Sequence, residues 1–285
     1  MAGPAVGRAD PARRPKIAIG FFGLARSLKW TLPSIKENII EPARELGDVR
    51  LFAHLYQQNH ITNPRSGEND PLDPDEYRLL ECDEVRLEEP GKCLEGARYE
   101  WVLSHGDAFH DDGKSLANLI HQLHSLQVVG EIIDAWKPNV VILARPDLHY
   151  HDNLSHLIRK HLKRSSLSLS LPDWQWYGGY NDRFAVCGSL ASKCYSNRLA
   201  LVPRYLKKTG GPLPAERFLK FCLNENSVCV YSAAVRASRV RANGQMVNED
   251  FRSISKRKIF RRKTEFYFYS LKNFFIKLLR KNFPI

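Results

Sequence analysis

Residues 16–26 read KIAIGFFGLAR, an apolar run followed by a loop with glycine and arginine. Isoleucine occupies positions 17 and 19, two phenylalanines follow, and the apolar run breaks at Gly23. A short, partly β-branched apolar run that ends at glycine is typical of a buried β-strand. Open α/β sheets bind ligands beyond the carboxyl ends of their strands, so the loop with Gly23 and Arg26 is the first candidate site.

Apolar spacing along the following residues predicts that strands and helices alternate. Strands are expected at 48–56, 82–89 and 140–144, and helical segments at 27–47 and 114–136. This alternation predicts a mostly parallel, Rossmann-like α/β sheet flanked by helices. The other expected elements are a polar loop at 60–76, a strand at 166–171, helices near 189–202 and 214–224, and strand material at 227–244.

Composition and charge divide the chain into a body and a tail. The 285 residues are 43% hydrophobic, enough for a sizeable core. Residues 252–285 carry a net charge of +10 out of +12 for the whole chain, so the body is nearly neutral. A neutral body argues against a nucleic-acid groove. We expect a disordered lead-in at 1–15, one domain at 16–251, and a basic tail at 252–285.

Targeting signals and cysteine spacing point to the cytoplasm. No window of about 18 apolar residues is present, and the first residues lack the apolar core of a secretory signal. The six cysteines form no C-x-x-C pair, which argues against a zinc ribbon. We therefore expect reduced thiols.

Two strand ends carry candidate binding residues. Gly23 lets a backbone approach a ligand closely, and Arg26 can grip a phosphate, although a solvated arginine in an ordinary turn fits equally well. Asp147 follows the strand at 140–144 and can hold a divalent cation that binds a diphosphate. Alternatively, Asp147 pairs with Arg145 or caps its own turn.

Histidines add a weaker candidate near Asp147. His149 and His151 alternate with it, so an extended segment puts all three side chains on one side. The histidines then form either a metal-binding pair or, more commonly, two solvated side chains.

A glycine-rich aromatic stretch, WQWYGGYNDRFAV at 174–186, forms a third candidate. Its aromatic rings can stack on a sugar or a base, and Asn181, Asp182 and Arg183 form a polar cluster. The alternative is a packed corner whose polar groups satisfy one another. Glu216 lies in the first turn of a predicted helix, where it either interacts with the helix dipole or acts as a catalytic base.

The order of these stretches resembles glycosyltransferase-like proteins of the GT-A type. The resemblance runs over residues 16–245 and is carried by KIAIGFFGLAR, VVILARPDLHY, GGYNDRFAV, ERFLKFCL and RVRANG. It implies a GT-A-like fold and a nucleotide-sugar donor bound at the carboxyl edge of the sheet. It also implies an Asp-x-Asp motif with Mn²⁺ or Mg²⁺, at the position where this chain has Arg145-Pro146-Asp147.

The resemblance assigns provisional roles to the candidate residues. Only one acid stands at the motif position, so either Arg145 replaces the metal or Asp182 supplies a second acid beside Asp147. Glu216 and Asp182 are the expected catalytic residues. The expected donor-binding residues are Gly23, Arg26, Arg145, Asp147, Asn181 and Arg183, and Asp147 is the expected metal ligand.

The basic tail predicts where such an enzyme acts. Residues 252–285 combine an aromatic apolar helix face with a basic one, a pattern that suits an anionic membrane surface. The alternative is a helix docked on the body. We expect a cytoplasmic protein peripheral to the inner membrane face, with a cell-surface glycan or lipid-linked glycan as acceptor and no nucleic-acid partner.

Two other functions remain open at this stage. GLARSLKWTL loosely resembles the phosphate loop of sulfotransferases, in which a helix N-terminus holds a phosphate. The missing second acid instead suits a non-catalytic domain that binds a glycan or a membrane partner.

Overall fold

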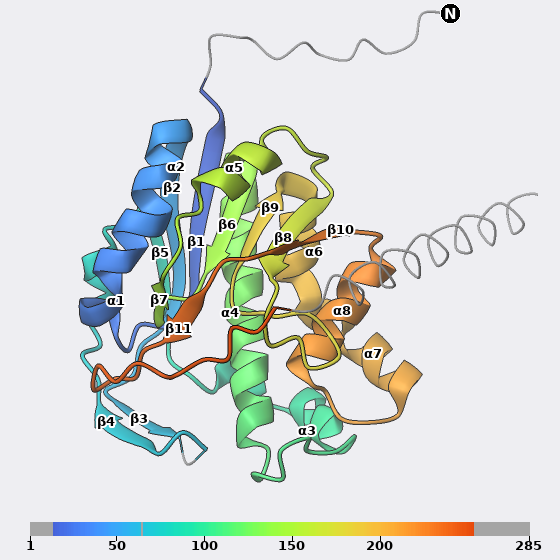
Figure 1. Ribbon diagram of the computed structural model, residues 1–285. Coiled ribbons are helices and arrows are strands. Elements are labelled where there is room, and N and C mark those ends of the chain that lie inside the picture. Colours follow the sequence, from blue (N-terminus) through green and yellow to red (C-terminus); the bar gives the residue numbers. More distant parts are fainter. Residues whose placement is uncertain (1–13, 64, 254–285) are drawn as a thin grey trace, which may run out of the picture.

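The computed structural model describes residues 14–63 and 65–253, which fold around a seven-stranded sheet (Figure 1). The strands lie in the order β10-β8-β9-β6-β1-β2-β5, and within this sheet only β9 runs antiparallel to its neighbours. This confirms the expected mostly parallel, Rossmann-like α/β sheet flanked by helices. The strands of this sheet are β1 (Lys16–Leu24), β2 (Asp48–Tyr56), β5 (Glu84–Glu88), β6 (Val140–Ala144), β8 (Ser168–Pro172), β9 (Ala185–Gly188) and β10 (Cys229–Ala233).

Helices cover both faces of the sheet (Figure 1). One face packs against α1, the π-helical turn η1, α2 and α5, and the other against α4, α6 and α8. The helical segments are α1 (Leu28–Ile35), η1 (Lys36–Ile40), α2 (Glu41–Leu46), η2 (Glu76–Leu80), η3 (Lys92–Leu94), α3 (Ala97–Leu103), α4 (Lys114–Trp136), α5 (Ser155–His161), α6 (Ser189–Ser196), η4 (Asn197–Leu201), α7 (Val202–Thr209) and α8 (Ala215–Glu225).

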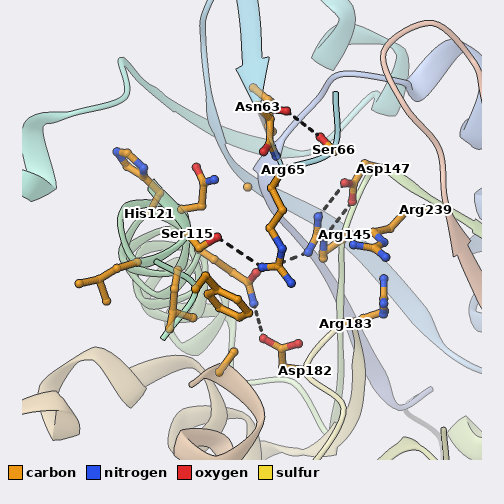
Figure 2. A pocket seen from close by; sticks show the side chains of 18 of the residues that line it. Asn63, Arg65, Ser66, Ser115, His121, Arg145, Asp147, Asp182, Arg183 and Arg239 are labelled. Atoms are coloured by element: carbon orange, nitrogen blue, oxygen red, sulfur yellow. Dashed lines mark hydrogen bonds and ion pairs between the residues drawn. The ribbon is translucent and has the colours of Figure 1, made fainter. Parts of the chain in front are cut away.

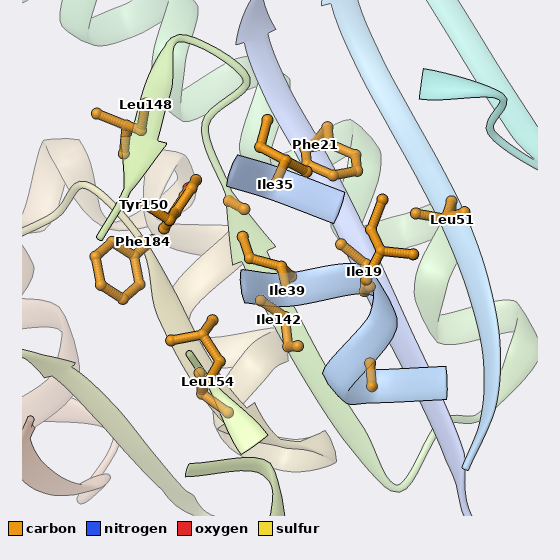
Figure 3. Close-up of a cluster of buried hydrophobic side chains, with 14 of the residues drawn as sticks. Ile19, Phe21, Ile35, Ile39, Leu51, Ile142, Leu148, Tyr150, Leu154 and Phe184 are labelled. Carbon is orange, nitrogen blue, oxygen red and sulfur yellow. The ribbon is translucent and has the colours of Figure 1, made fainter. Parts of the chain in front are cut away.

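The alternating side chains of β1 explain its central position. Ile19 and Phe21 point to the face covered by α1 and η1, where Figure 3 shows them beside Ile35 and Ile39. Phe22, from the next position, lies in the cluster on the other face with α4. Because successive residues of a strand face opposite sides, a strand buried on both faces must be apolar at every position. That is the pattern of KIAIGFF.

The segment at 60–76 differs from its prediction as a loop. It contains an antiparallel ribbon of β3 (His60–Asn63) and β4 (Glu68–Pro71). Its side chains are mostly polar, so apolar alternation gives no signal for these strands. A second small antiparallel pair joins β7 (Leu148–Tyr150) to β11 (Ala237–Arg239), and it holds the segment after β6 in place.

Several expectations concern residues at the ends of the chain. The predicted basic helix and nearly all of the lead-in fall at 254–285 and 1–13, outside the described residues. Among residues 14–63 and 65–253, no helix is long and apolar enough to cross a membrane.

All six cysteines are free, as expected for reduced thiols.

Candidate active site

A cleft of about 1420 Å³ opens at the carboxyl ends of β1 and β6. Its walls come from the loops after these strands, the β3–β4 ribbon, the first turns of α4, and the start of α8 (Figure 2). The cleft brings together all eight residues singled out from the sequence: Gly23, Arg26, Arg145, Asp147, Asn181, Asp182, Arg183 and Glu216.

Gly23 contributes open space at the end of β1. Its φ of 103° lies in the region that favours glycine, and a Cβ built there meets no atom within 4 Å. Its backbone N–H donates to Ser125 Oγ at 2.8 Å, which stabilises the turn. Gly23 therefore supplies room for a ligand, with its own donor already used inside the protein.

Two arginines clamp the carboxylate of Asp147. Arg145 donates to both oxygens, with Nε to Oδ1 at 2.9 Å and Nη2 to Oδ2 at 2.7 Å (Figure 2). Arg26 Nη2 also donates to Oδ2, at 2.7 Å. Although burial alone would raise the pKa of Asp147, these guanidinium groups hold that pKa well below its usual range. Asp147 is thus ionised, buried and already paired.

This clamp makes Asp147 a poor ligand for a divalent cation. A Mn²⁺ or Mg²⁺ ion at its oxygens would lie against two guanidinium charges that contact the same atoms. The proposed second acid, Asp182, accepts a hydrogen bond from Gln122 Nε2 at 2.9 Å. The residues around Asp147 therefore do not fit the metal that the resemblance implied. The structure instead shows the alternative considered for this aspartate, an ion pair with Arg145.

Arg26 links Asp147 to the β3–β4 ribbon. Its Nη1 donates to Glu68 Oε2 at 3.1 Å, and Arg241 Nη1 contacts the same oxygen at 2.7 Å. Ser66 Oγ also donates to this oxygen, at 2.6 Å. The contacts of Arg26 make it a buried bridge between two acids, not a solvated arginine. The ribbon and the loop after β11 are thereby tied to the floor of the cleft.

Arg183 is held by a further buried acid, Glu249. Arg183 donates to both oxygens of Glu249, at 3.1 and 3.2 Å, and Arg239 Nε donates to Oε1 at 2.8 Å. Gln175 completes the network with a 2.9 Å hydrogen bond to Oε2. Although burial alone would raise the pKa of Glu249, its hydrogen bonds and ion pairs with Arg239 and Arg183 lower that pKa, so the ionised acid keeps both guanidinium groups at the cleft wall.

The cleft is rich in arginine beyond the predicted residues. Seven of the described arginines line it, against four acids, of which Asp147 is neutralised by its clamp. The four arginines that sequence reasoning missed are Arg65, Arg217, Arg239 and Arg241. Arg239 and Arg241 alternate within the strand material expected at 227–244, a pattern that puts two side chains on one side and could have pointed to them.

The aromatic loop is a packed corner with one exposed ring. Trp174 and Trp176 are buried, and their indole N–H groups donate to the carbonyls of Val235 and Pro172. Asn181 uses its amide inside the loop, donating to the Trp174 carbonyl at 2.9 Å and accepting from the Arg183 N–H at 3.0 Å. Asn181 thus shapes the loop. Tyr177, which is 64% exposed and lines the cleft, offers a ring for stacking.

Glu216 and Asp182 both line the cleft, and the charge of Asp182 acts on Glu216. Burial, with the negative charge of Asp182 as a second cause, raises the pKa of Glu216 to about 7. A carboxyl group with a pKa near neutrality can accept a proton from a substrate hydroxyl at physiological pH. The first turn of α8 therefore presents a general-base candidate beside the arginines.

The glycine pair in the aromatic loop sets the position of Glu216. A Cβ on Gly179 would lie 1.8 Å from the Glu216 carbonyl oxygen, and the next residue, Tyr180, donates its N–H to this oxygen at 3.0 Å. Only glycine allows the loop to come this close to α8.

Replacing Gly179 with alanine tests this contact. We expect Gly179→Ala to push the loop away from α8 and to lower the free energy of unfolding by about 1–3 kcal/mol. The pKa of Glu216 should fall as its surroundings become wetter, which carboxyl-resolved NMR titration would measure. The matched control is Gly211→Ala, where a Cβ meets no atom within 4 Å and φ lies outside the left-handed region. Equal destabilisation by both changes would contradict the contact as the cause.

Comparison with known proteins gives a likeness in structure alone. In sequence, the chain matches no protein-family model and no curated protein. Among solved structures, it is similar to the apo form of mouse xyloside xylosyltransferase 1, with 12% sequence identity and a TM-score of 0.40. The matched region covers 78% of this chain and 85% of the mouse chain. Function therefore has to be inferred from the residues of the cleft.

Proposed function

We propose that this protein is a glycosyltransferase that moves a sugar from a nucleoside-diphosphate donor to a glycan hydroxyl. The observation that carries the proposal is the joint placement of arginines and Glu216 in one cleft at the carboxyl edge of a parallel sheet. That edge is where open α/β sheets bind nucleotides. A diphosphate needs positive charge, and a hydroxyl acceptor needs a base.

In this proposal, arginines stabilise the leaving diphosphate without a metal ion. Arg145 and Arg183 line the cleft with their guanidinium groups fixed by Asp147 and Glu249. Donors fixed before the reaction stabilise developing charge without having to reorganise. Arginine also matches phosphate geometry through paired N–H groups. Arg26, which is buried between two acids, positions Asp147 and the ribbon.

Glu216 then acts as the base on the acceptor, if the transfer inverts the configuration of the sugar. Its raised pKa suits proton abstraction near neutral pH. Asp182 is the second candidate and raises the pKa of Glu216 by its charge. The exposed ring of Tyr177 supplies a stacking surface for the base or the sugar of the donor.

The sulfotransferase alternative is disfavoured by Glu76. The carboxylate of Glu76 accepts a hydrogen bond from the Lys29 N–H at 3.0 Å, at the start of α1. A sulfotransferase of the type considered needs this helix N-terminus for a phosphate of its donor. In this chain, a buried carboxylate from η2 already takes that position.

The acceptor class and the membrane location rest on the sequence of the tail. The basic, aromatic pattern at 252–285 favours an anionic membrane surface and hence a glycan or glycolipid acceptor beside it.

Turnover of a donor panel tests the proposal. The full chain would be incubated with UDP-, GDP- and CMP-linked sugars, with and without a membrane-derived glycan fraction, and nucleotide release measured. We expect one donor class to be consumed with saturation, faster when acceptor is present. A folded protein that binds a nucleotide but never consumes a donor would support the non-catalytic alternative instead.

A further inference from the structure

A cluster of three metal-binding side chains lies outside the cleft, between α4 and the ends of β2 and β5. Glu88 Oε2 is 3.3 Å from His54 Nε2 and 3.0 Å from His124 Nε2. The three ligand atoms lie within 4.8 Å of one another. His54 is buried, whereas the side chains of Glu88 and His124 are 23% and 25% exposed. Neither the donor nor the acceptor chemistry proposed above uses these side chains.

Hydrogen bonds around Ser125 orient the ring of His54. The Ser125 hydroxyl lies 2.8 Å from the His54 carbonyl oxygen, to which it donates. Its oxygen accepts from the Gly23 N–H at 2.8 Å and lies 2.9 Å from His54 Nδ1. In the tautomer in which Nδ1 donates to Ser125 Oγ, the lone pair of the neutral imidazole is on Nε2 and faces Glu88. This is the tautomer that binds a metal ion through Nε2.

Three ligand atoms converge at one point. His54 Nε2 lies 3.3 Å from Glu88 Oε2, and a carboxylate oxygen can only accept. His124 brings a second nitrogen to the same oxygen. A cation at the centre of the three side chains would satisfy the lone pairs of all three ligand atoms at once.

We propose that His54, Glu88 and His124 bind a zinc ion through His54 Nε2, Glu88 Oε2 and His124 Nε2. Two imidazoles and one carboxylate are a ligand set that zinc prefers. Tetrahedral ligands at about 2.0–2.1 Å from zinc lie about 3.3–3.4 Å apart, close to the observed spacing from Glu88 to both histidines. Ser125 supplies the outer hydrogen bond that orients a metal-binding histidine.

The bound ion would hold α4 against the sheet next to the cleft. His54 comes from β2, Glu88 from the end of β5, and His124 from α4, so the metal joins elements far apart in sequence. Ser125 links this site to Gly23, which lines the cleft. The inference does not depend on the proposed transferase activity, because it concerns metal binding and stability.

Titration of untagged, metal-free full-length protein with zinc alone tests the site. We expect one zinc per chain by elemental analysis, a higher melting temperature with zinc, and visible absorption of a four-coordinate ion when cobalt(II) replaces zinc. His124→Asn should abolish the zinc-dependent rise in melting temperature. Ser125→Ala should weaken zinc binding by about 10- to 100-fold, as loss of an outer partner does.

Two control variants separate this site from other histidines. His156→Asn changes an exposed histidine elsewhere, and His149→Asn removes one member of the His149–His151 pair, whose rings lie 5.0 Å apart. Both should bind zinc as the unaltered chain does. If His124→Asn does not fold, Glu88→Gln, at a part-exposed position, gives the same test. Zinc binding that survives both His124→Asn and Glu88→Gln, or no binding at micromolar zinc, would overturn the inference.

Discussion

Replacing Arg145 with methionine should lower the free energy of unfolding by about 3 kcal/mol and remove nucleotide binding. Methionine keeps much of the side-chain volume but leaves Asp147 with Arg26 as its remaining ion-pair partner among the described residues. Breaking a buried ion pair from one side costs about 3–5 kcal/mol, and the remaining arginine keeps the loss at the lower end. Urea denaturation measures the stability, and calorimetry measures the nucleotide binding.

An exposed arginine–aspartate pair provides the matched control. Arg236 donates to both oxygens of Asp152, at 2.8 and 3.0 Å, outside the cleft. Arg236→Met should change the stability by no more than about 1 kcal/mol and leave nucleotide binding intact. Equal effects of Arg145→Met and Arg236→Met would contradict a special role for the clamp.

The free energy of unfolding at low pH gives a second measurement of the ion pairs that hold Asp147. The pKa of Asp147 is depressed in the folded chain, so its stabilising contribution is complete above the unfolded-state pKa of about 3.9. That contribution is lost as the pH falls below this value, because protonation breaks the ion pairs. In Arg145→Met, the loss of stability between about pH 4 and pH 2 should therefore be smaller.

Replacing Glu216 with glutamine should reduce sugar transfer by about 10²- to 10⁴-fold while nucleotide binding stays unchanged. Glutamine keeps the shape of the side chain but cannot accept a proton, and general-base catalysis contributes an effect of this size. The rate of the unaltered enzyme should rise with pH through about 7, the pKa of Glu216, and then level off. The residual activity of Glu216→Gln should lack this rise.

The free energy of unfolding should also depend on pH through Glu216, in the opposite direction from its dependence through Asp147. A carboxyl group whose pKa is raised in the folded state stabilises the protein below its unfolded-state pKa of about 4.3. This contribution is lost as the pH rises through about 7, where Glu216 ionises in its buried position. Glu216→Gln should therefore flatten the stability profile between these values, and Glu131→Gln, at an exposed position of α4, should not. A transfer rate unchanged in Glu216→Gln would rule out its role as the base.

Topology explains why the location of the site was predictable. Apolar runs identify strands, and parallel strands place their carboxyl ends at one edge, so residues after separate strands meet there. Gly23, Arg26, Arg145 and Asp147 line one cleft for this reason. Glu216 joins them because the glycine-rich loop packs on the start of α8.

The partners within the site could not be read from the sequence. Glu68 lies on a polar ribbon that lacks apolar alternation, and Glu249 lies in an irregular segment. Each binds arginines that are distant in the chain; Arg183 and Glu249, for example, are 66 positions apart. The resemblance implied a metal at Asp147, and the sequence gives no sign of its second neutralising arginine, Arg26, which is 121 residues away in the chain. Ion pairs between such distant residues depend on tertiary packing, which local spacing does not encode.

The aromatic loop shows that even residues close together in the sequence can have roles that the sequence does not distinguish. Trp174, Trp176 and Tyr177 share one segment, yet only Tyr177 is exposed to the cleft. The two tryptophans bond to the carbonyls of Val235 and Pro172, so packing and not ligand stacking explains them. Composition alone could not separate these roles.

Calorimetric titration with UDP, GDP, CMP and adenosine 3′,5′-bisphosphate, in EDTA and again with Mn²⁺, tests whether arginines hold the donor diphosphate without a metal ion. We expect one nucleoside diphosphate to bind in EDTA, Mn²⁺ to change its affinity by less than about twofold, and Arg145→Met to abolish the binding. Binding only with Mn²⁺ would contradict the arginine-based site. Binding of the adenosine bisphosphate alone, or of no nucleotide by the folded protein, would contradict the glycosyltransferase assignment itself.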